Sequence, residues 1–354
     1  MPVPPIGYGG TEGVVDVLSR GLRQAGVDVR LFSVGSSTSP VPKAWWYEQP
    51  VRPMGRTEAE AVQVVAAYAA LADVDVIHDH TTLGPLAFGG RGGVPILTTC
   101  HGAFTPELRL LYRRIARTVP LVAISQSQRR SAPELPFARV IYHGLDLSGF
   151  PVGEGDGGYL AFLGRMGHGK GLHRAIRIAR AAGRPLRFAA KMREEAECEY
   201  FDRVVAPLLS PDVEYLGEIG PSGRAELLRG AGALLNPISW PEPFGLVMVE
   251  ALAFGTPVLA FPDGAAPEIV RDGQTGFLRG DEEELARCVA RLDEIDRADC
   301  RRDVERRFSM ERMVRLYLEQ YERLLPGRPR GLRPPSPSRG STGSGDPRPV
   351  GAVR

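Results

Sequence analysis

The sequence predicts an α/β protein with two doubly wound domains, each built on a parallel sheet covered by helices. Short apolar runs alternate with longer helical patterns along the chain, and this series starts afresh near residue 158. A stretch rich in Gly and Pro, 148–158, separates the two series and is the expected linker. We therefore expect an N-terminal domain over 1–150 and a C-terminal domain over 151–305.

The first series contains apolar runs that are typical of buried parallel strands, because each ends in small or polar residues. These runs are "VDVRLFSVG" (27–35), "VDVIHDH" (74–80), "VPILTTCHG" (94–102) and "PLVAISQS" (120–127). Residues 10–26 predict an amphipathic helix, since apolar residues recur there at helical spacing and Gly26 provides a C-terminal stop.

The start of the first series departs from the usual pattern. A doubly wound domain normally opens with a buried strand that leads into its first Gly-rich loop. Here the loop "PPIGYGGTE" (4–12) comes at once, with no strand visible before it. Either translation begins further upstream, or this domain lacks a central strand.

The second series predicts strands within 158–166, 185–191, 213–219, 232–238 and 256–262, with helices between them. Residues 306–325 form an amphipathic pattern and predict a final helix, which is expected to pack back on the N-terminal domain. From residue 326 to 354 the chain is rich in Pro, Gly, Ser and Arg, a composition that predicts a disordered basic tail.

Composition excludes several classes of protein. Lys and Arg nearly balance Asp and Glu, and the formal net charge of +2 gives no preference for nucleic acid. At most, the basic tail predicts weak contact with an anionic membrane. The four cysteines form no Cys-x-x-Cys pair, which favours free thiols in a reducing cytoplasm over a disulfide framework. No signal peptide and no apolar run of about 20 residues is present, so we expect a cytoplasmic protein.

Two glycine-rich loops are candidates for binding phosphate. Gly9 and Gly10 stand at the start of a predicted helix, where free N–H groups attract anions, although an ordinary turn is an equal alternative. The loop "LGRMGHGKG" (163–171) follows a strand directly and holds Arg165 and Lys170 among glycines that include Gly164. Two cations at the carboxyl end of a strand favour a diphosphate site over a solvated basic loop.

The stretch "NPISWPEPFGLVMVEALAFGTPV" (236–258) places two carboxylates on either side of a Pro-Phe-Gly turn. Glu242 precedes a helix that is expected to begin at Phe244, Gly245 and Leu246, and Glu250 is expected about two turns inside it. A carboxylate accepts two hydroxyl hydrogens at once, which suits a ribose diol or a sugar. The alternative is a solvated helix, but the helix dipole would account for Glu242 and not for Glu250.

Histidines end two of the predicted strands. His101 follows the strand at 94–102, a suitable place for a ligand contact. His78 and His80 end the strand at 74–80 on one face. No further ligand stands at useful spacing, so we expect no metal site.

Together these motifs resemble the retaining glycosyltransferases of family 4, which have the GT-B fold of two Rossmann-like domains facing across a cleft. The resemblance rests on "YGGTE" (8–12), "YHGLD" (142–146), "YLAFLGRMGHGKG" (159–171) and "PEPFGLVMVEALAFGTPVLAF" (241–261), with its Glu-x7-Glu pattern. It extends from about residue 4 to 325, and it is more specific in the second half. The family ordinarily has a strand before the Gly-Gly loop, which this chain does not show.

The resemblance implies roles for the candidate residues. Arg165 and Lys170 would hold the diphosphate, with Gly9 and Gly10 approaching it from across the cleft. Glu250 would bind the ribose diol. Glu242, with the amides of Phe244, Gly245 and Leu246, would contact the donor sugar and its phosphate, and His101 would lie near the reacting carbon.

The function implied is transfer of a hexose from a nucleotide-diphosphate sugar to an unidentified sugar, lipid or small-molecule acceptor. Retention of configuration follows from the resemblance alone, and no metal or other cofactor is expected. Two alternatives stay open. One is a sugar-nucleotide-binding protein with impaired catalysis, and the other is a different GT-B enzyme such as a nucleotide-sugar epimerase.

Overall fold

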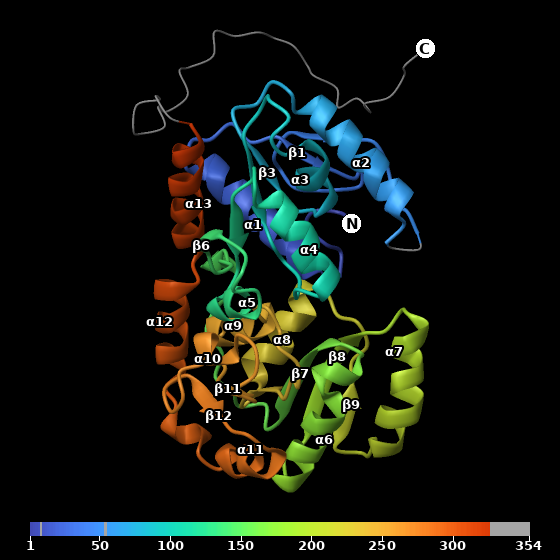
Figure 1. Ribbon diagram of the computed structural model, residues 1–354. Coiled ribbons are helices and arrows are strands. Elements are labelled where there is room, and N and C mark those ends of the chain that lie inside the picture. Colours follow the sequence, from blue (N-terminus) through green and yellow to red (C-terminus); the bar gives the residue numbers. More distant parts are fainter. Residues whose placement is uncertain (8, 53–54, 326–354) are drawn as a thin grey trace. The chain divides into compact units, whose positions relative to one another are not determined.

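A computed structural model describes residues 1–7, 9–52 and 55–325 (Figure 1). Contacts within the chain divide it into two compact units. Unit 1 comprises Met1–Ile124, Arg129–Gly144 and the chain from Met310 onward, and unit 2 comprises Ser125–Gln128 and Leu145–Ser309. The predicted tail, 326–354, lies outside the described residues.

Unit 1 contains parallel strands in two separate sheets. β1 (Leu31–Ser33) pairs with β2 (Lys43–Trp45), while the other sheet has the order β3-β4-β5-β6. The latter strands are β3 (Ile77–Asp79), β4 (Ile96–Thr99), β5 (Leu121–Ala123) and β6 (Phe137–Val140). Between β5 and β6 the register shifts at Leu121 and Val122.

The helices of unit 1 bury apolar faces against these sheets and against one another. They are α1 (Gly10–Gln24), α2 (Thr57–Ala70), α3 (Leu83–Phe88), α4 (Pro106–Ile115), α5 (Gln126–Ser131), whose first residues are assigned to unit 2, and α13 (Met310–Leu324). α1 packs on α13 so closely that a Cβ at Gly21 would lie 2.6 Å from a methyl group of Val314. Thr105 caps α4 by accepting a hydrogen bond from the Leu108 amide.

Two strands of unit 1 are much shorter than the sequence predicts. The apolar run at 27–35 forms a strand only over Leu31–Ser33, and the run at 74–80 only over Ile77–Asp79. Each has a hydrogen-bonded neighbour on one side, β2 and β4 respectively, and no strand of the described chain on the other. An edge position alone does not set this length, because β5 lies between β4 and β6 and also has three residues.

Unit 2 has one continuous parallel sheet of six strands in the order β12-β11-β10-β7-β8-β9. These are β7 (Leu160–Arg165), β8 (Leu186–Lys191), β9 (Val213–Tyr215), β10 (Leu234–Asn236), β11 (Val258–Ala260) and β12 (Gly276–Leu278). β7 lies at the centre, where Leu160 and Ala161 are fully buried. Each predicted strand of the second series contains an observed one.

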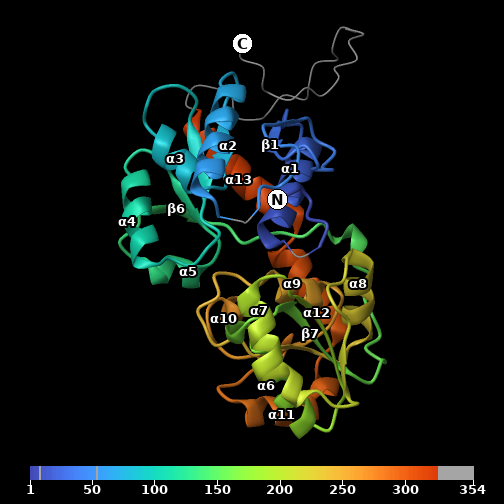
Figure 2. The same cartoon turned by 90° about the vertical axis from the view of Figure 1, so that its right-hand side faces the viewer.

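Helices cover the sheet of unit 2, and α6 and α11 lie side by side in both views (Figures 1 and 2). The helices are α6 (Leu172–Ala181), α7 (Glu195–Tyr200), α8 (Pro221–Gly230), α9 (Leu246–Ala253), α10 (Ala266–Ile269), α11 (Glu282–Val289) and α12 (Arg297–Arg307). Asp281 and Asp296 cap α11 and α12 by accepting backbone N–H bonds.

The single helix predicted over 306–325 is instead divided. α12 ends at Arg307 and α13 begins at Met310, because Phe308 and Ser309 leave the helical path. The Phe308 carbonyl accepts a hydrogen bond from the Leu145 amide, and Leu145 and Ser309 form an isolated parallel bridge. No helix of the described ranges is both long enough and apolar enough to cross a bilayer.

Candidate functional site

The strand order of unit 2 reverses between β7 and β10. From β7 the chain adds β8 and β9 on one side, then returns to place β10, β11 and β12 on the other. At such a switch point the loops leave the carboxyl ends of two neighbouring strands in opposite directions and open a crevice for ligands. Here those loops are 166–171, after β7, and 237–245, after β10.

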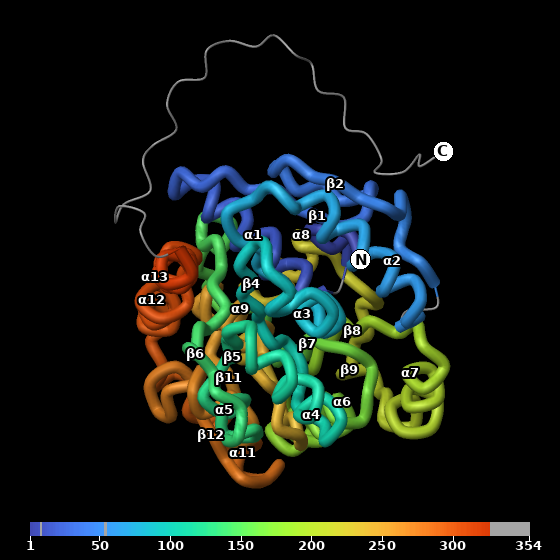
Figure 3. The backbone as a smooth tube through the Cα atoms, turned by 45° about the horizontal axis from the view of Figure 1, so that its top comes forward, coloured from blue at the N-terminus to red at the C-terminus, as the bar shows by residue number. Residues whose placement is uncertain are grey.

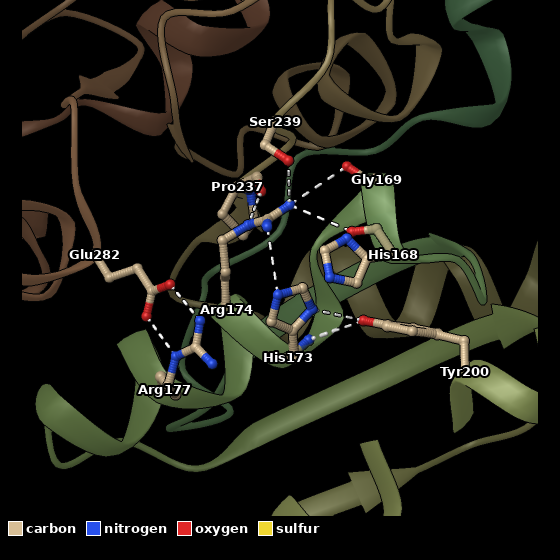
Figure 4. Close-up of polar contacts among 9 residues, drawn as sticks. All are labelled: His168, Gly169, His173, Arg174, Arg177, Tyr200, Pro237, Ser239 and Glu282. Atoms are coloured by element: carbon tan, nitrogen blue, oxygen red, sulfur yellow. Dashed lines mark hydrogen bonds and ion pairs between the residues drawn. The ribbon is translucent and has the colours of Figure 1, made fainter. Parts of the chain in front are cut away.

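The two loops are bound to each other by Arg174 of α6 (Figure 4). Its Nε donates to the Pro237 carbonyl at 2.8 Å, and its Nη2 donates to Ser239 Oγ at 2.9 Å and to the carbonyls of His168 and Gly169. The guanidinium is buried, which lowers the pKa of Arg174. Arg174 therefore fixes the basic loop against the loop after β10.

Gly171 allows this close approach. Its φ of 79° is left-handed, and a Cβ there would lie 2.3 Å from the Pro237 carbonyl oxygen. Next to it, burial and the charge of Arg174 lower the pKa of His173 to about 4, so the imidazole is neutral at pH 7. Nε2 of His173 accepts from Arg174 at 3.3 Å, which leaves Nδ1–H to donate to the Tyr200 hydroxyl at 2.8 Å (Figure 4).

At the switch point, Lys170 meets Glu242. Lys170 Nζ lies 2.5 Å from Glu242 Oε1, and the two side chains are only 12% and 16% exposed. The ammonium group also lies 5.6 Å from the ring centroid of Trp240, a cation–π distance. Within the described residues, Glu242 Oε2 is buried without a hydrogen-bond partner. The pair thus combines a cation with a carboxylate oxygen that can accept a further hydrogen bond.

Arg165 ends β7, and its register partner at the end of β8 is Lys191. Its Nε lies 3.8 Å from Glu197 Oε1, and the side chain is 55% exposed. Lys191 Nζ contacts the same Glu197 oxygen at 3.2 Å. Arg165 therefore stands beside a second cation at the carboxyl end of the sheet. Gly164 precedes it in β7, where a Cβ would have ordinary contacts at 3.6 Å.

The turn after Glu242 requires glycine. Gly245 has a φ of 102° immediately before α9, which begins at Leu246, and a Cβ there would lie 2.5 Å from Met248 Cε. Phe244 is buried, with its ring edge-on to Phe308. Leu246 and the residues that follow it present the first amides of a helix, which have no intrahelical acceptor.

Glu250 is the fifth residue of α9, so it lies just over one turn inside the helix and not about two. The helix begins later than expected because Phe244 and Gly245 belong to the turn. Arg224 of α8 donates from Nη1 to Glu250 Oε1 at 2.7 Å. Burial raises the pKa of Glu250, and the charge of Arg224 opposes this. Arg224 thus holds one oxygen of Glu250 in place.

The remaining predicted residues belong to unit 1. Gly9 lies just before α1 and Gly10 is its first residue. A Cβ at Gly9 would lie 2.6 Å from Pro5 Cβ, so the lack of a side chain there accommodates Pro5 of the same loop.

His101 belongs to a cluster of four imidazoles, of which that of His143 is buried and the others are half-buried. Its Nε2 lies 2.9 Å from His80 Nδ1, and its ring stacks on that of His143 at 5.3 Å between centroids. His78 contacts Tyr321 Oη and Thr99 Oγ1, each at 2.8 Å.

Burial lowers the pKa of all the histidines in this cluster, to about 4 for His101 and about 3 for His78. They are therefore neutral at pH 7 and act as hydrogen-bonding groups without charge. Within the ranges that the structure describes, no three His, Cys, Asp or Glu side chains gather as a metal site would require.

Sequence reasoning missed Arg174, Arg224 and Trp240. The sequence spacing of Arg174 and Arg224 does not distinguish them from the other arginines. Their acceptors, Pro237 and Glu250, are 63 and 26 residues away in the chain. Trp240 had a signal, since an aromatic residue two positions before Glu242 stands in a loop that follows a buried strand.

Unit 2 is a doubly wound α/β domain with a crevice at its switch point, and comparisons with known proteins give its family. Residues 151–306 match the model described as "Glycosyl transferases group 1", and residues 8–148 match "Glycosyltransferase Family 4". The chain belongs to the family 4 glycosyltransferases of the GT-B fold.

Curated relatives match only in part. A D-inositol 3-phosphate glycosyltransferase of Streptomyces scabiei is 44% identical over 84 residues, 23% of this chain and 19% of the relative. A phosphatidyl-myo-inositol mannosyltransferase of Mycobacterium tuberculosis is 29% identical over 234 residues, 60% of this chain and 61% of the relative. The matches thus span less than two thirds of these relatives.

Solved structures match over most of the chain. AviGT4, a glycosyltransferase involved in avilamycin A biosynthesis, is 28% identical with a TM-score of 0.69, covering 92% of this chain and 93% of its own. Sucrose-phosphate synthase of Thermosynechococcus elongatus is 20% identical with a TM-score of 0.80, covering 92% and 96%. HepE of Anabaena, solved with UDP and glucose, is 20% identical with a TM-score of 0.72, covering 89% and 96%. The latter two show likeness of fold.

Proposed function

We propose that the chain transfers a hexose from a nucleotide-diphosphate sugar to a hydroxyl group of its acceptor, with the donor bound at the switch point of unit 2. The observation that carries this proposal is the contact of Lys170 with Glu242 at 2.5 Å, where loops from two central strands meet. A cation next to a carboxylate whose second oxygen can still accept a hydrogen bond suits a nucleotide sugar, which has phosphate groups next to sugar hydroxyls.

The diphosphate leaving group is where negative charge grows as the glycosidic bond breaks. Lys170 supplies a compact charge, Arg165 an exposed fork of N–H donors, and the start of α9 offers backbone amides beyond Gly245. Fixed groups of this kind stabilise a developing anion without reorganising. On this basis we propose leaving-group stabilisation without a metal ion.

Glu250 is proposed to bind the ribose diol of the nucleotide. Arg224 holds Oε1, and the side chain is largely buried at 14% exposure. Since a carboxylate oxygen accepts more than one hydrogen bond, the held carboxylate can still receive two hydroxyl groups. Arg224 is thus a positioning residue that also favours the ionised form of Glu250.

We further propose retention of anomeric configuration through an oxocarbenium-like transition state. The bond from the sugar carbon to the phosphate oxygen breaks as the bond to the acceptor oxygen forms on the same face. The acceptor proton passes to the departing phosphate oxygen, so no side chain needs to act as nucleophile. His101, placed near the donor sugar by the family resemblance, would act as a neutral hydrogen-bonding group.

Names of similar proteins suggest the substrates to test. The HepE structures contain UDP, glucose or UDP-glucose, and curated relatives are named for inositol 3-phosphate and phosphatidyl-myo-inositol. We therefore propose a UDP-hexose as donor and an inositol phosphate, free or in a lipid headgroup, as acceptor.

The test is a panel of UDP-, GDP-, ADP- and dTDP-sugars, scored by thermal stabilisation and by hydrolysis, followed by transfer assays with inositol phosphate and phosphatidylinositol. We expect one nucleotide to stabilise the protein selectively, slow hydrolysis of its sugar, and an α-linked product from an α-linked donor that forms equally in EDTA. Selective binding without hydrolysis or transfer would instead support a sugar-nucleotide-binding protein. An absence of binding across the panel would overturn the proposal.

A further inference from the structure

Trp240 lies between the two loops that meet at the switch point of unit 2. Its indole ring packs on the backbone of Gly169, where a Cβ would lie only 3.1 Å from Trp240 Cδ1. The loop that contains Gly169 joins β7 to α6, and its course can be followed in Figure 3. The side chain of Trp240 is half-buried, so the protein covers only part of it. The indole is thus close enough to the basic loop to act on its charged side chain.

The backbone on both sides of Trp240 is held by hydrogen bonds. Before it, the Ser239 amide donates to the Gly169 carbonyl at 3.3 Å, and Ser239 Oγ accepts from Arg174 at 2.9 Å. After it, the Glu242 amide donates to the Trp240 carbonyl at 2.7 Å. Because these bonds fix the chain on either side, the fold sets the position of the indole before any donor binds.

The ammonium group of Lys170 is held less firmly than the backbone that carries it. Arg174 fixes the loop by donating to two of its carbonyls. Among the described residues, the ammonium itself contacts Glu242 Oε1 at 2.5 Å and the ring of Trp240 at 5.6 Å from the centroid. A lysine ammonium stands on a flexible four-carbon stem, so these two contacts decide where the charge lies.

A bound donor would remove one of the two contacts. In the proposed function, on which this inference rests, Lys170 binds the diphosphate and Glu242 binds sugar hydroxyls. A diphosphate has more negative charge than one carboxylate, so it competes with Glu242 for the ammonium group. The ring of Trp240 does not compete, because it is uncharged and attracts the cation through its quadrupole. The N–H groups of the ammonium therefore stay available to phosphate oxygens.

We propose that Trp240 is the positioning residue of Lys170. Its indole ring holds the ammonium group at the switch point while the diphosphate replaces Glu242 as the ion-pair partner. Trp240 contacts no reacting atom in this scheme and acts only through Lys170. Tryptophan attracts a cation more strongly than phenylalanine does, and leucine has no aromatic quadrupole. The rate of transfer should therefore decrease in the order Trp, Phe, Leu at this position.

The first test measures steady-state kinetics of the full chain with the nucleotide sugar that the panel selects. Trp240→Leu should lower kcat by about five- to tenfold, and Trp240→Phe by a smaller factor. The KM for the donor should change much less, because the charge that Lys170 stabilises grows only as the glycosidic bond breaks. Trp46→Leu, which removes a 43% exposed indole of unit 1, is the matched control and should change neither constant.

A second test separates cation–π attraction from packing. Tryptophans that carry increasing numbers of fluorine atoms keep nearly the shape of indole but lose negative charge from the ring face. We expect log kcat to fall stepwise with fluorination in the unaltered chain and to stay constant in Trp240→Phe, which still contains Trp45 and Trp46. An equal response in both chains, or no response in either, would contradict a role of the ring in holding the cation.

A third test asks whether Trp240 acts through Lys170. The double variant Lys170→Ala/Trp240→Leu should have the same kcat as Lys170→Ala alone, because the group that Trp240 positions is already absent. If Trp240→Leu lowered kcat by the same factor in both backgrounds, the positioning role would be wrong.

These comparisons keep two kinds of failure apart. If Lys170→Ala lowers kcat but Trp240→Leu does not, only the inference about Trp240 fails. If Lys170→Ala leaves kcat unchanged, the proposed function of the switch point fails as well. Thermal unfolding shows whether each variant folds. Should Trp240→Leu not fold, the fluorinated series still decides, because it leaves the packing of the indole nearly unchanged.

Discussion

The two units follow one architectural plan but differ at its centre. Unit 2 has a continuous sheet, and its central strand β7 pairs with β8 along six residues, Leu160–Arg165. Unit 1 has two sheets with a cavity of about 1370 Å³ between them, and the flanking strands β1 and β3 have three residues each. Both units contain three-residue strands, but only in unit 2 do such strands, β10 and β11 among them, belong to one continuous sheet.

The units also differ in how they hold polar groups. The switch point of unit 2 is built from charges in pairs, Lys170 with Glu242 and Arg224 with Glu250. Unit 1 instead contains neutral, half-buried imidazoles, such as His80 and His101, which hydrogen-bond to each other. We therefore expect changes in unit 2 to alter donor binding and turnover, and changes in unit 1 to alter mainly its stability and pH response.

The largest effect is expected for Lys170→Ala. Loss of the charge that stabilises the leaving diphosphate should lower kcat by about 10²- to 10³-fold, the range found when one transition-state donor is removed. Steady-state kinetics with the donor selected by the panel checks this. Arg187→Ala is the matched control, because Arg187 forms an exposed pair with Glu214 at the start of β8.

A second variant separates chemistry from folding. Lys170→Ala leaves Glu242 without its ion-pair partner, so the double variant with Glu242→Gln removes that unpaired charge. If the double variant restored turnover, the lower turnover of Lys170→Ala would come from the unpaired carboxylate of Glu242. Lys170 would then have no catalytic role. An unchanged kcat in Lys170→Ala would remove the switch point of unit 2 from the active site.

Glu250→Ala should weaken binding of the nucleoside diphosphate by about 1–3 kcal/mol, because buried ribose hydroxyl groups would lose their acceptor. Isothermal titration calorimetry measures this directly. Glu214→Ala, which removes an exposed carboxylate on β9, should leave the affinity unchanged. An equal loss of affinity in both variants would mean that Glu250 does not bind the ribose diol.

Within unit 1, two glycines of α1 should respond oppositely to alanine. Gly21→Ala should destabilise the protein by about 1–3 kcal/mol, because the new methyl group would overlap Val314 and Met310 of α13. Gly13→Ala meets nothing within 4 Å and should stabilise α1 by about 0.5–1 kcal/mol. Urea unfolding gives both values, and a stable Gly21→Ala variant would contradict the close packing of α1 on α13.

The smallest predicted effect is an acid sensitivity that is stronger in unit 1 than in unit 2. Burial lowers the pKa of His101 to about 4 and of His78 to about 3, while an unfolded histidine titrates near about 6.5. Between these values the unfolded state binds more protons, so stability falls as the pH drops from about 6.5 toward 4. Asp79 partly opposes this, because burial raises its pKa and the folded state then takes up its proton more readily.

Hydrogen exchange at pH 7 and pH 5 measures this difference unit by unit. The variant His101→Asn should reduce the loss of protection in unit 1 at pH 5. Unit 2 contains one histidine of the same kind, His173, and provides the comparison within the same sample. If both units lost protection from exchange equally at pH 5, and His101→Asn changed nothing, the histidines of unit 1 would not be the cause of its acid sensitivity.

The sequence alone determined the class of fold and much of the site in unit 2. Alternating apolar runs and helical patterns located β7 to β11, because a strand buried on both faces must be apolar throughout. Gly245 and Gly171 were visible as glycines next to candidate ligands, and the structure shows the left-handed backbone and close contacts that require them. The strands β2, β6 and β12 were missed, since each forms a sheet edge and three or four residues give little periodic signal.

Only the tertiary structure decided which charges meet and where the sheet of unit 1 is interrupted. Lys170 and Glu242 are 72 residues apart in the chain, and their contact depends on β10 returning to lie beside β7. The apolar run at 27–35 has the composition of a full strand, yet only Leu31–Ser33 pairs. Local sequence sets what a segment prefers, but backbone hydrogen bonds and charge pairs need a partner that the fold must deliver.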